Sequence, residues 1–128
     1  ADIKLFRTAE MYLIRAEAQA QKTQTGLGAN DLNALRTARI NGYTDEAFAN
    51  KEDLIEAILL ERYKELAFEG HRIHDLRRHM LPVTRIPEDV VNALGAVTLE
   101  PSDKEYFYPI PNSEMQANKN MVQNPAYR

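Results

Sequence analysis

The stretch EAILLERYKELAFEGHRIHDLRR, Glu56–Arg78, decides the predicted fold of this chain. Upstream of it, Asn50 is a favourable N-cap residue, and Asp53 belongs to an acidic first turn. The apolar residues then recur every three or four positions, as on one face of an α-helix. They are Ile55, Ile58, Leu59, Tyr63 and Leu66. We therefore expect a long amphipathic helix, a bend at Gly70, and a second helix that ends at the basic residues 77–79.

Two further helices are expected before this stretch. At about 100° per residue, a helix over residues 8–22 would carry two opposite apolar faces. One face contains Ala9, Tyr12, Leu13, Ala16 and Ala20, and the other contains Met11, Ile14 and Ala18. We interpret Thr25–Ala29 as a turn because it holds two glycines. A helix over residues 31–40 would follow, with Asn30 as its N-cap and Asn41-Gly42 as its stop. The short connection predicts a helical hairpin.

Helical periodicity weakens after Pro82. Residues 87–94 predict a short helix with proline in its first position, and residues 112–118 predict one more helical turn. We find no alternating strand pattern of useful length. The sequence therefore predicts a mainly α-helical fold in which helical hairpins are followed by an irregular C-terminal wrap.

The composition is that of an ordinary globular chain. Its 128 residues suit one domain, with 44% hydrophobic residues, 27% charged residues and a net charge of -3. Domains that bind nucleic acid usually carry a strong basic excess, so we expect no nucleic-acid partner. The chain has no cysteine, which excludes disulfides and thiolate ligands within it. No apolar run approaches the roughly 18 residues that span a bilayer.

Three segments of the chain resemble motifs of the RagB/SusD family of outer-membrane nutrient-binding lipoproteins. Glu56–Arg78 resembles the signature helix of that family, and Arg7–Ala18 resembles an earlier helix. Tyr106–Met115 and Gln123–Tyr127 resemble the C-terminal end of the family's proteins. The segments follow the family's order and span nearly the whole chain.

The resemblance implies a fold of tetratricopeptide-like helix pairs, although the sequence signature of the tetratricopeptide repeat itself is not present. Proteins of the RagB/SusD family are much longer than this chain. The resemblance therefore also implies that residues 1–128 form a C-terminal RagB/SusD-like domain, as a fragment of a longer protein.

The function that the resemblance implies is non-catalytic. The protein would be a surface-exposed lipoprotein of the outer membrane, with its lipid anchor outside this chain. It would bind a glycan or another nutrient and deliver it to a SusC-like, TonB-dependent transporter. The alternative is a helical adaptor that docks a protein partner and binds no small molecule. A signal peptide and a lipid-attachment cysteine upstream in the gene, beside a transporter gene, would favour the first function.

Charged side chains gather in the second half of Glu56–Arg78. Glu61, Glu65 and Glu69 recur at four-residue spacing, where like charges repel by roughly a few tenths of a kcal/mol. Basic residues three positions away would offset this repulsion. We predict a structural ion-pair network of Arg62, Glu65, Glu69, His71, Arg72 and Asp75. We predict no metal site, because His74 and His79 diverge by about 140° on a continuous helix.

No pattern predicts catalysis or a cofactor. The chain has two serines, Ser102 and Ser113, and neither lies in a Gly-x-Ser-x-Gly motif. Glycan binding requires exposed aromatic rings, and the chain has no tryptophan. Tyr43 and Phe48, in the loop between the predicted helices, are the candidate glycan contacts. In the RagB/SusD family, however, ligand contacts come from variable loops that lie largely outside the shared motifs.

The two apolar faces of the first predicted helix also predict self-association. The second helix would cover one of these faces. The third helix carries an additional apolar strip, which consists of Ala57, Leu60, Ala67 and Phe68. An uncovered apolar patch of roughly several hundred Å² favours association. We therefore expect the isolated chain to dimerise or aggregate, unless residues 97–128 fold back over the patch.

Overall fold

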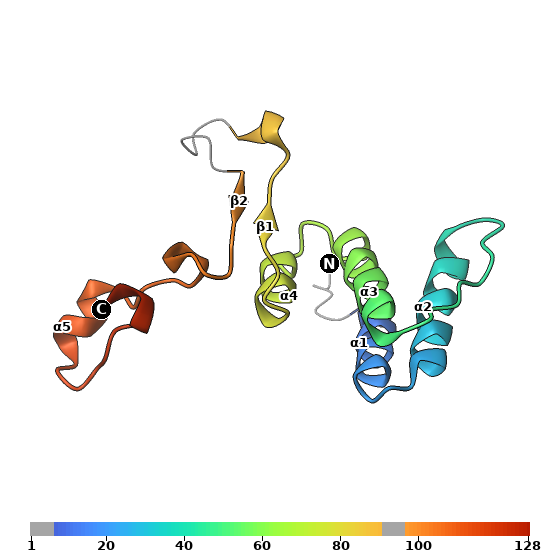
Figure 1. The fold of residues 1–128 in the computed structure, drawn as a ribbon, viewed down its shortest axis with the longest axis horizontal. Helices are drawn as coiled ribbons and strands as arrows, with labels where there is room; N and C mark the ends of the chain where they lie inside the picture. Colours follow the sequence, from blue (N-terminus) through green and yellow to red (C-terminus); the bar gives the residue numbers. More distant parts are fainter. Residues whose placement is uncertain (1–6, 91–96) are drawn as a thin grey trace, which may run out of the picture. The chain divides into compact units, whose positions relative to one another are not determined.

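The structure is a computed structural model, and it describes residues 7–90 and 97–128. The chain divides into two compact units, one that ends at Arg72 and one that begins at Ile73. The first unit is helical, and the second consists of short elements joined by irregular backbone (Figure 1).

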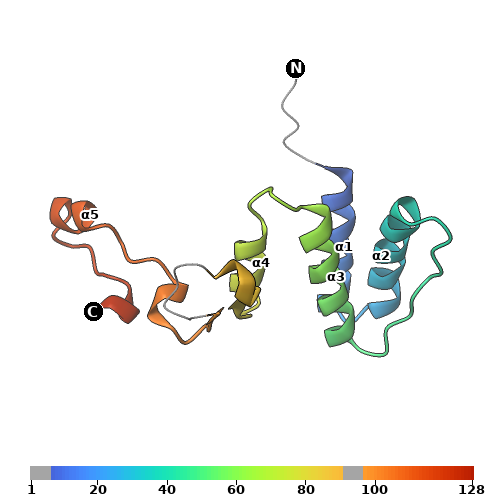
Figure 2. The same cartoon turned by 90° about the horizontal axis from the view of Figure 1, so that it is seen from above.

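Three helices lie side by side in the first unit (Figures 1 and 2). They are α1 (Thr8–Gln21), α2 (Thr25–Arg39) and α3 (Lys51–Glu65). Helix α1 packs against both of the others, and the connection from α1 to α2 is short enough to form the predicted hairpin. A longer loop, residues 40–50, leads from α2 to α3.

The core of the first unit lies where the three helices meet. Its buried members are Ala9, Leu13, Ala16 and Ala20 from α1, Ala29, Leu32 and Leu35 from α2, and Leu54 and Ile58 from α3. The α1 members all belong to one of the two predicted faces of that helix. The opposite face is open, since Met11 is 46% exposed and Ile14 is 47% exposed. The additional strip expected on the third helix does not form as predicted, because α3 ends at Glu65 and leaves Ala67 and Phe68 in the turn that follows. Of its members, Ala57 packs against the core, whereas Leu60 and Phe68 are exposed. Self-association of the chain stays a prediction.

Helix α2 begins earlier than its sequence predicts. The interpretation of Thr25–Ala29 as a turn is wrong, because these residues form the first turns of α2. The N-cap position belongs to Gln24, so the N-cap prediction for Asn30 is wrong too. The reason is a tertiary contact between α1 and α2. A Cβ atom on Gly28 would lie 2.7 Å from the Ala16 carbonyl oxygen. Glycine is thus present to let two helices approach closely, and this contact compensates for its low helix propensity.

Helix α3 begins as its sequence predicts. The Asn50 side chain accepts a hydrogen bond of 2.8 Å from the Asp53 backbone N–H, which confirms Asn50 as the N-cap. The helix ends at Glu65, and Leu66 is its C-cap residue. The predicted bend at Gly70 is confirmed, because this glycine adopts a left-handed conformation with φ of 81°.

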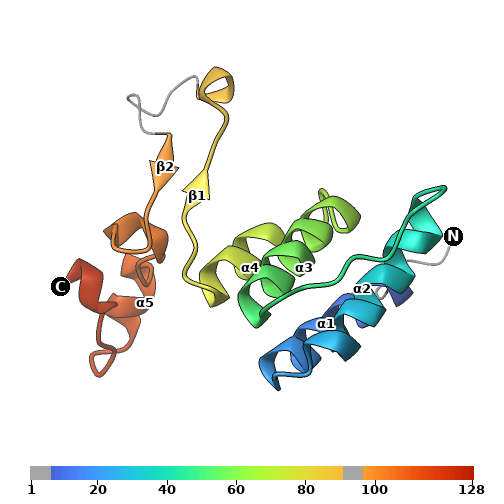
Figure 3. The ribbon, with the colours of Figure 1, turned by 45° about the vertical axis from the view of Figure 1, so that its right-hand side comes forward.

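In residues 73–90 and 97–128, the second unit contains short elements only, and its two strands lie next to each other (Figure 3). Its elements are α4 (Arg72–Arg78), β1 (Val83–Thr84), a 3₁₀ turn (Pro87–Asp89), β2 (Thr98–Leu99), a second 3₁₀ turn (Lys104–Tyr106), α5 (Asn112–Ala117) and a third 3₁₀ turn (Pro125–Tyr127). The strands pair antiparallel, with Val83 opposite Leu99. Strands of two residues are too short to show alternation in a sequence. Of the helix expected over residues 87–94, positions 91–94 lie outside the described residues.

The C-terminal motif organises the second unit around one buried ring. Tyr106 is fully buried, and its hydroxyl donates a hydrogen bond of 2.7 Å to the Leu81 carbonyl. The Arg77 guanidinium lies 5.9 Å from the Tyr106 ring centroid and 4.4 Å from that of Tyr108. Further along, the Gln123 side-chain amide bonds both backbone groups of Ile110, at 2.8 and 2.9 Å.

Candidate functional site

The loop before α3 is held in place by one asparagine of α2. The buried Asn33 side chain donates a hydrogen bond of 2.9 Å to the Glu46 carbonyl and accepts one of 3.2 Å from the Glu46 N–H. Its oxygen also accepts a hydrogen bond of 2.8 Å from the Tyr43 hydroxyl. The side-chain amide thus bonds to both backbone groups of Glu46, as a neighbouring strand would.

An arginine one turn further along α2 ties the same loop to α3. Arg36 donates from Nε to Glu61 at 2.9 Å and from Nη1 to the Glu46 carboxylate at 2.6 Å. A longer bond of 3.4 Å reaches the Tyr43 hydroxyl. The Arg36 and Glu61 side chains are only 10% and 7% exposed. Burial opposes the charged form of Arg36, but hydrogen bonds to Tyr43 and Glu61 outweigh it, so the pKa of Arg36 is raised.

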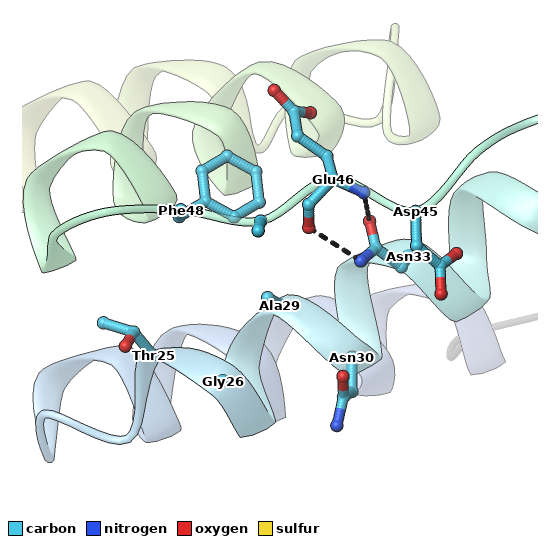
Figure 4. A pocket seen from close by; sticks show the side chains of 9 residues that line it. Thr25, Gly26, Ala29, Asn30, Asn33, Asp45, Glu46 and Phe48 are labelled. Carbon is cyan, nitrogen blue, oxygen red and sulfur yellow. Dashed lines mark hydrogen bonds between the residues drawn. The ribbon is translucent and has the colours of Figure 1, made fainter.

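A pocket of about 320 Å³ lies between the start of α2 and this loop (Figure 4). Its lining consists of Thr25, Gly26, Ala29, Asn30, Asn33, Asp45, Glu46, Ala47 and Phe48. We call it the α2–loop pocket. The hydrogen bonds between Asn33 and Glu46 join its two walls (Figure 4). The pocket is therefore formed by the same contacts that fix the path of the loop.

Of the two candidate glycan contacts, Phe48 lines the α2–loop pocket and Tyr43 does not. Tyr43 does not line the α2–loop pocket, and its hydroxyl is bonded to Asn33 and Arg36. Phe48 lines the pocket and also packs against the core of the first unit. Sequence reasoning did not identify Asn30 and Asp45, which line the same pocket. No motif could have indicated them, because they come together only through the path of the loop.

Glu65, the last residue of α3, and Glu69, in the turn that follows it, bind basic residues from outside the predicted network. Arg7 forms ion pairs with Glu65, at 2.6 Å, and with Glu69. Arg39, from the end of α2, donates to both carboxylate oxygens of Glu65 at 2.8 and 3.0 Å. Arg7 thus bridges Glu65 and Glu69, and neither Arg7 nor Arg39 was among the predicted members of the network. The Glu65 carboxylate is 8% exposed, so this pairing is largely sheltered from solvent.

The other members of the predicted network have the following contacts. His71 lies 3.9 Å from the Glu10 carboxylate, and the Arg72 guanidinium lies 4.8 Å from the Tyr63 ring centroid. Asp75 pairs with Arg78 at 2.9 Å. Arg62 and Asp75 are both buried. Whether all six residues form one network stays a prediction.

The paired Glu65 predicts a pH dependence. The hydrogen bond from Arg39 lowers the pKa of Glu65, burial opposes this, and the charges of Arg39 and Arg7 lower the pKa further. Because the pKa of Glu65 is lower in the folded state than its unfolded-state value of about 4.3, the ionised carboxylate stabilises the fold fully at pH values above 4.3. This contribution to the free energy of unfolding is lost as the pH falls through the lowered pKa. Glu65→Gln should therefore cost about 1–2 kcal/mol at pH 7, and less at pH 3. Urea unfolding at both pH values measures this, and an equal cost at pH 3 would contradict the charge argument.

The described residues, 7–90 and 97–128, carry neither a metal-binding cluster nor a helix that could span a membrane. No group of three or more His, Asp or Glu side chains there is arranged to hold a metal ion. None of the helices in the same ranges has the length and apolar character needed to cross a membrane.

Comparison with known proteins gives the family of the chain. The sequence profile of the SusD family matches residues 1–127. The chain belongs to the SusD family. Among curated relatives, the starch-binding protein SusD of Bacteroides thetaiotaomicron is 36% identical over 129 residues, which cover 99% of this chain and 22% of SusD. The chain therefore spans about a fifth of the length of that relative.

Solved structures of SusD-like proteins share the fold of the chain. A putative sugar-binding protein from Bacteroides vulgatus matches with a TM-score of 0.76 and 32% identity, over 97% of this chain and 28% of its own. A SusD-like carbohydrate-binding protein from the same species matches with a TM-score of 0.74 and 35% identity. The match covers 94% of this chain and 30% of that protein's chain. The predicted family and the predicted mainly helical, tetratricopeptide-like fold are confirmed.

Proposed function

We propose that this SusD-family chain is part of a non-catalytic nutrient-binding lipoprotein that binds a glycan at the surface of the outer membrane. The match of the SusD profile to residues 1–127 is the observation that carries the proposal. The names of its relatives support the ligand class: one is a starch-binding protein, and two solved structures are described as sugar-binding or carbohydrate-binding. The same names support a binding protein over an enzyme.

The remaining parts of the proposal follow from the resemblance of the chain to the RagB/SusD family. The chain would form the C-terminal portion of a longer protein whose lipid anchor lies elsewhere. The partner would be a SusC-like, TonB-dependent transporter that receives the glycan. The alternative function is a helical adaptor without a small-molecule ligand, for which the open face of α1, with Met11 and Ile14, provides a surface.

Two measurements on the whole protein test this function. Isothermal titration with maltoheptaose and a panel of other neutral and acidic oligosaccharides should detect binding of at least one glycan. Co-purification from outer membranes should recover a TonB-dependent transporter. Binding of no glycan together with recovery of a protein partner would favour the adaptor, and failure of both would remove the proposed function.

Most glycan contacts of the whole protein should lie outside the three motifs. We expect alanine at Tyr43 or at Phe48 to weaken glycan affinity less than changes in loops that this chain does not contain. For Tyr43, the reason is that its hydroxyl is already bonded to Asn33 and Arg36. Titration of both variants with the bound glycan checks this. Complete loss of binding in either single variant would instead place the main site within this chain.

A further inference from the structure

We propose that the α2–loop pocket is an accessory site for a single neutral sugar ring, with the ring of Phe48 as its apolar wall. This inference rests on the proposed function, because it assigns a second contact to the same class of ligand. It adds a site that lies within residues 25–48, between the motifs Arg7–Ala18 and Glu56–Arg78.

The dimensions of the pocket set the size of the ligand. At about 320 Å³, it lies at the lower end of the range of small-molecule sites, which begins at roughly 300 Å³. Such a volume admits one sugar ring and does not enclose an oligosaccharide. The pocket would therefore hold one unit of a glycan while the rest of that glycan lies outside.

The lining combines apolar surface with unused polar groups. Phe48, Ala29 and Ala47 offer carbon atoms to the C–H groups of a sugar ring. Thr25, Asn30 and Asp45 line the same space, and their side chains make no hydrogen bond within the described part of the chain. These three side chains offer hydroxyl, amide and carboxylate groups, which suit the hydroxyls of a sugar.

The pocket is built before any ligand arrives. Asn33 fixes the backbone of Glu46 with two hydrogen bonds, and Arg36 fixes the Glu46 carboxylate at 2.6 Å. Phe48 is held against the core of the first unit. Binding would therefore order few side chains, and a low ordering cost favours binding of even a small ligand.

The charges of the lining select a neutral ligand. The ionisable side chains of the pocket are Asp45 and Glu46, and both are acidic. Glu46 is paired with Arg36, whereas the Asp45 carboxylate has no ion-pair partner among residues 7–90 and 97–128. The first turn of α2 opposes this with a partial positive charge of about one half, which is less than the full charge of a carboxylate. A uronic acid should therefore bind more weakly than a neutral sugar.

A titration of the isotope-labelled chain tests the site, with maltose as the first probe and with glucose and glucuronate as a neutral and an anionic probe of equal size. Maltose should shift backbone amide signals of residues 25–30 and 45–48, with a Kd of about 1–10 mM for so small a contact. Glucuronate should bind at least about threefold more weakly than glucose, and Asp45→Asn should remove that difference. Phe48→Leu, which keeps apolar packing but removes the ring, should weaken maltose binding by about three- to tenfold.

Tyr63→Ala is the matched control, because Tyr63 is an exposed aromatic residue of α3 that does not line the pocket. It should leave maltose binding unchanged. The accessory site is refuted if maltose shifts no signal in residues 25–30 and 45–48, or if Phe48→Leu and Tyr63→Ala have the same effect. The proposed function is tested separately by titration of the whole protein, so glycan binding there with no shift here would remove only the accessory site.

Discussion

Replacing Gly28 with valine should lower the free energy of unfolding of the first unit by about 2–4 kcal/mol, as overpacking at a close contact does. A Cβ at this position would lie 2.7 Å from the Ala16 carbonyl oxygen and 3.0 Å from Leu54 Cδ2. The carbonyl belongs to the backbone of α1, so relief requires α1 and α2 to separate. That separation would also loosen the shared core, of which Leu13 and Leu32 are fully buried members.

Gly26→Ala provides the matched control on the same helix. A Cβ on Gly26 meets no atom within 4 Å, and alanine in place of glycine favours a helix by up to about 1 kcal/mol. Urea unfolding followed by circular dichroism should therefore show a lower midpoint for Gly28→Val and an unchanged or higher midpoint for Gly26→Ala. Equal midpoints for Gly28→Val and the unmodified chain would contradict the close approach of α1 and α2.

Arg36→Met should have a comparable effect for an electrostatic reason. The substitution leaves the Glu61 carboxylate, 7% exposed, without its main partner, and removal of one member of a buried pair commonly costs about 3–5 kcal/mol. Lys64 Nζ lies 3.9 Å from the same carboxylate and offsets part of this cost. We therefore expect a loss of about 2–4 kcal/mol in the free energy of unfolding at pH 7.

Two comparisons separate this ion pair from a general effect of losing an arginine. Arg39→Met removes an arginine whose side chain is 48% exposed, and exposed pairs contribute up to about 1 kcal/mol. Arg36→Met combined with Glu61→Met should cost less than Arg36→Met alone, because no unpaired charge stays buried. Urea midpoints of all the variants measure this. If Arg36→Met and Arg39→Met lower the free energy of unfolding equally, the burial of the Arg36–Glu61 pair adds nothing to the stability of the fold.

The helices were predictable where their signals are local. Apolar periodicity and the cap at Asn50 are properties of adjacent residues, and α1 and α3 form where these signals predict helices. The predicted faces are wrong at the two tyrosines, because Tyr12 and Tyr63 are exposed, while Leu54, outside the predicted face of α3, is fully buried. The start of α2 was not predictable in this way. Two glycines within four residues indicate a turn locally, whereas the role of Gly28 depends on Ala16 in another helix. The tertiary contact therefore overrides the local preference.

The candidate site was less predictable because its contacts join distant residues. Helical spacing predicted a stripe that includes Glu65 and Glu69, but α3 ends at Glu65 and both carboxylates are paired by Arg7 instead. Arg7 is 58 residues from Glu65, and Arg39 is 26 residues from it. The α2–loop pocket likewise combines side chains from two segments. Of its lining, Phe48 was identified as an aromatic residue in a loop, and the polar members required the folded path of residues 45–48.

The hydrogen bonds from Asn33 to the backbone of Glu46 place few demands on the sequence of the loop. This side chain holds the main chain of Glu46 and does not hold the side chains of Asp45 and Ala47. The proposed sugar contacts of Asp45 and Ala47 are therefore made by side chains that do not fix the path of the loop. Related proteins could exchange residues 44, 45 and 47 for others and keep the same loop path, so that new ligand preferences arise without redesign of the scaffold.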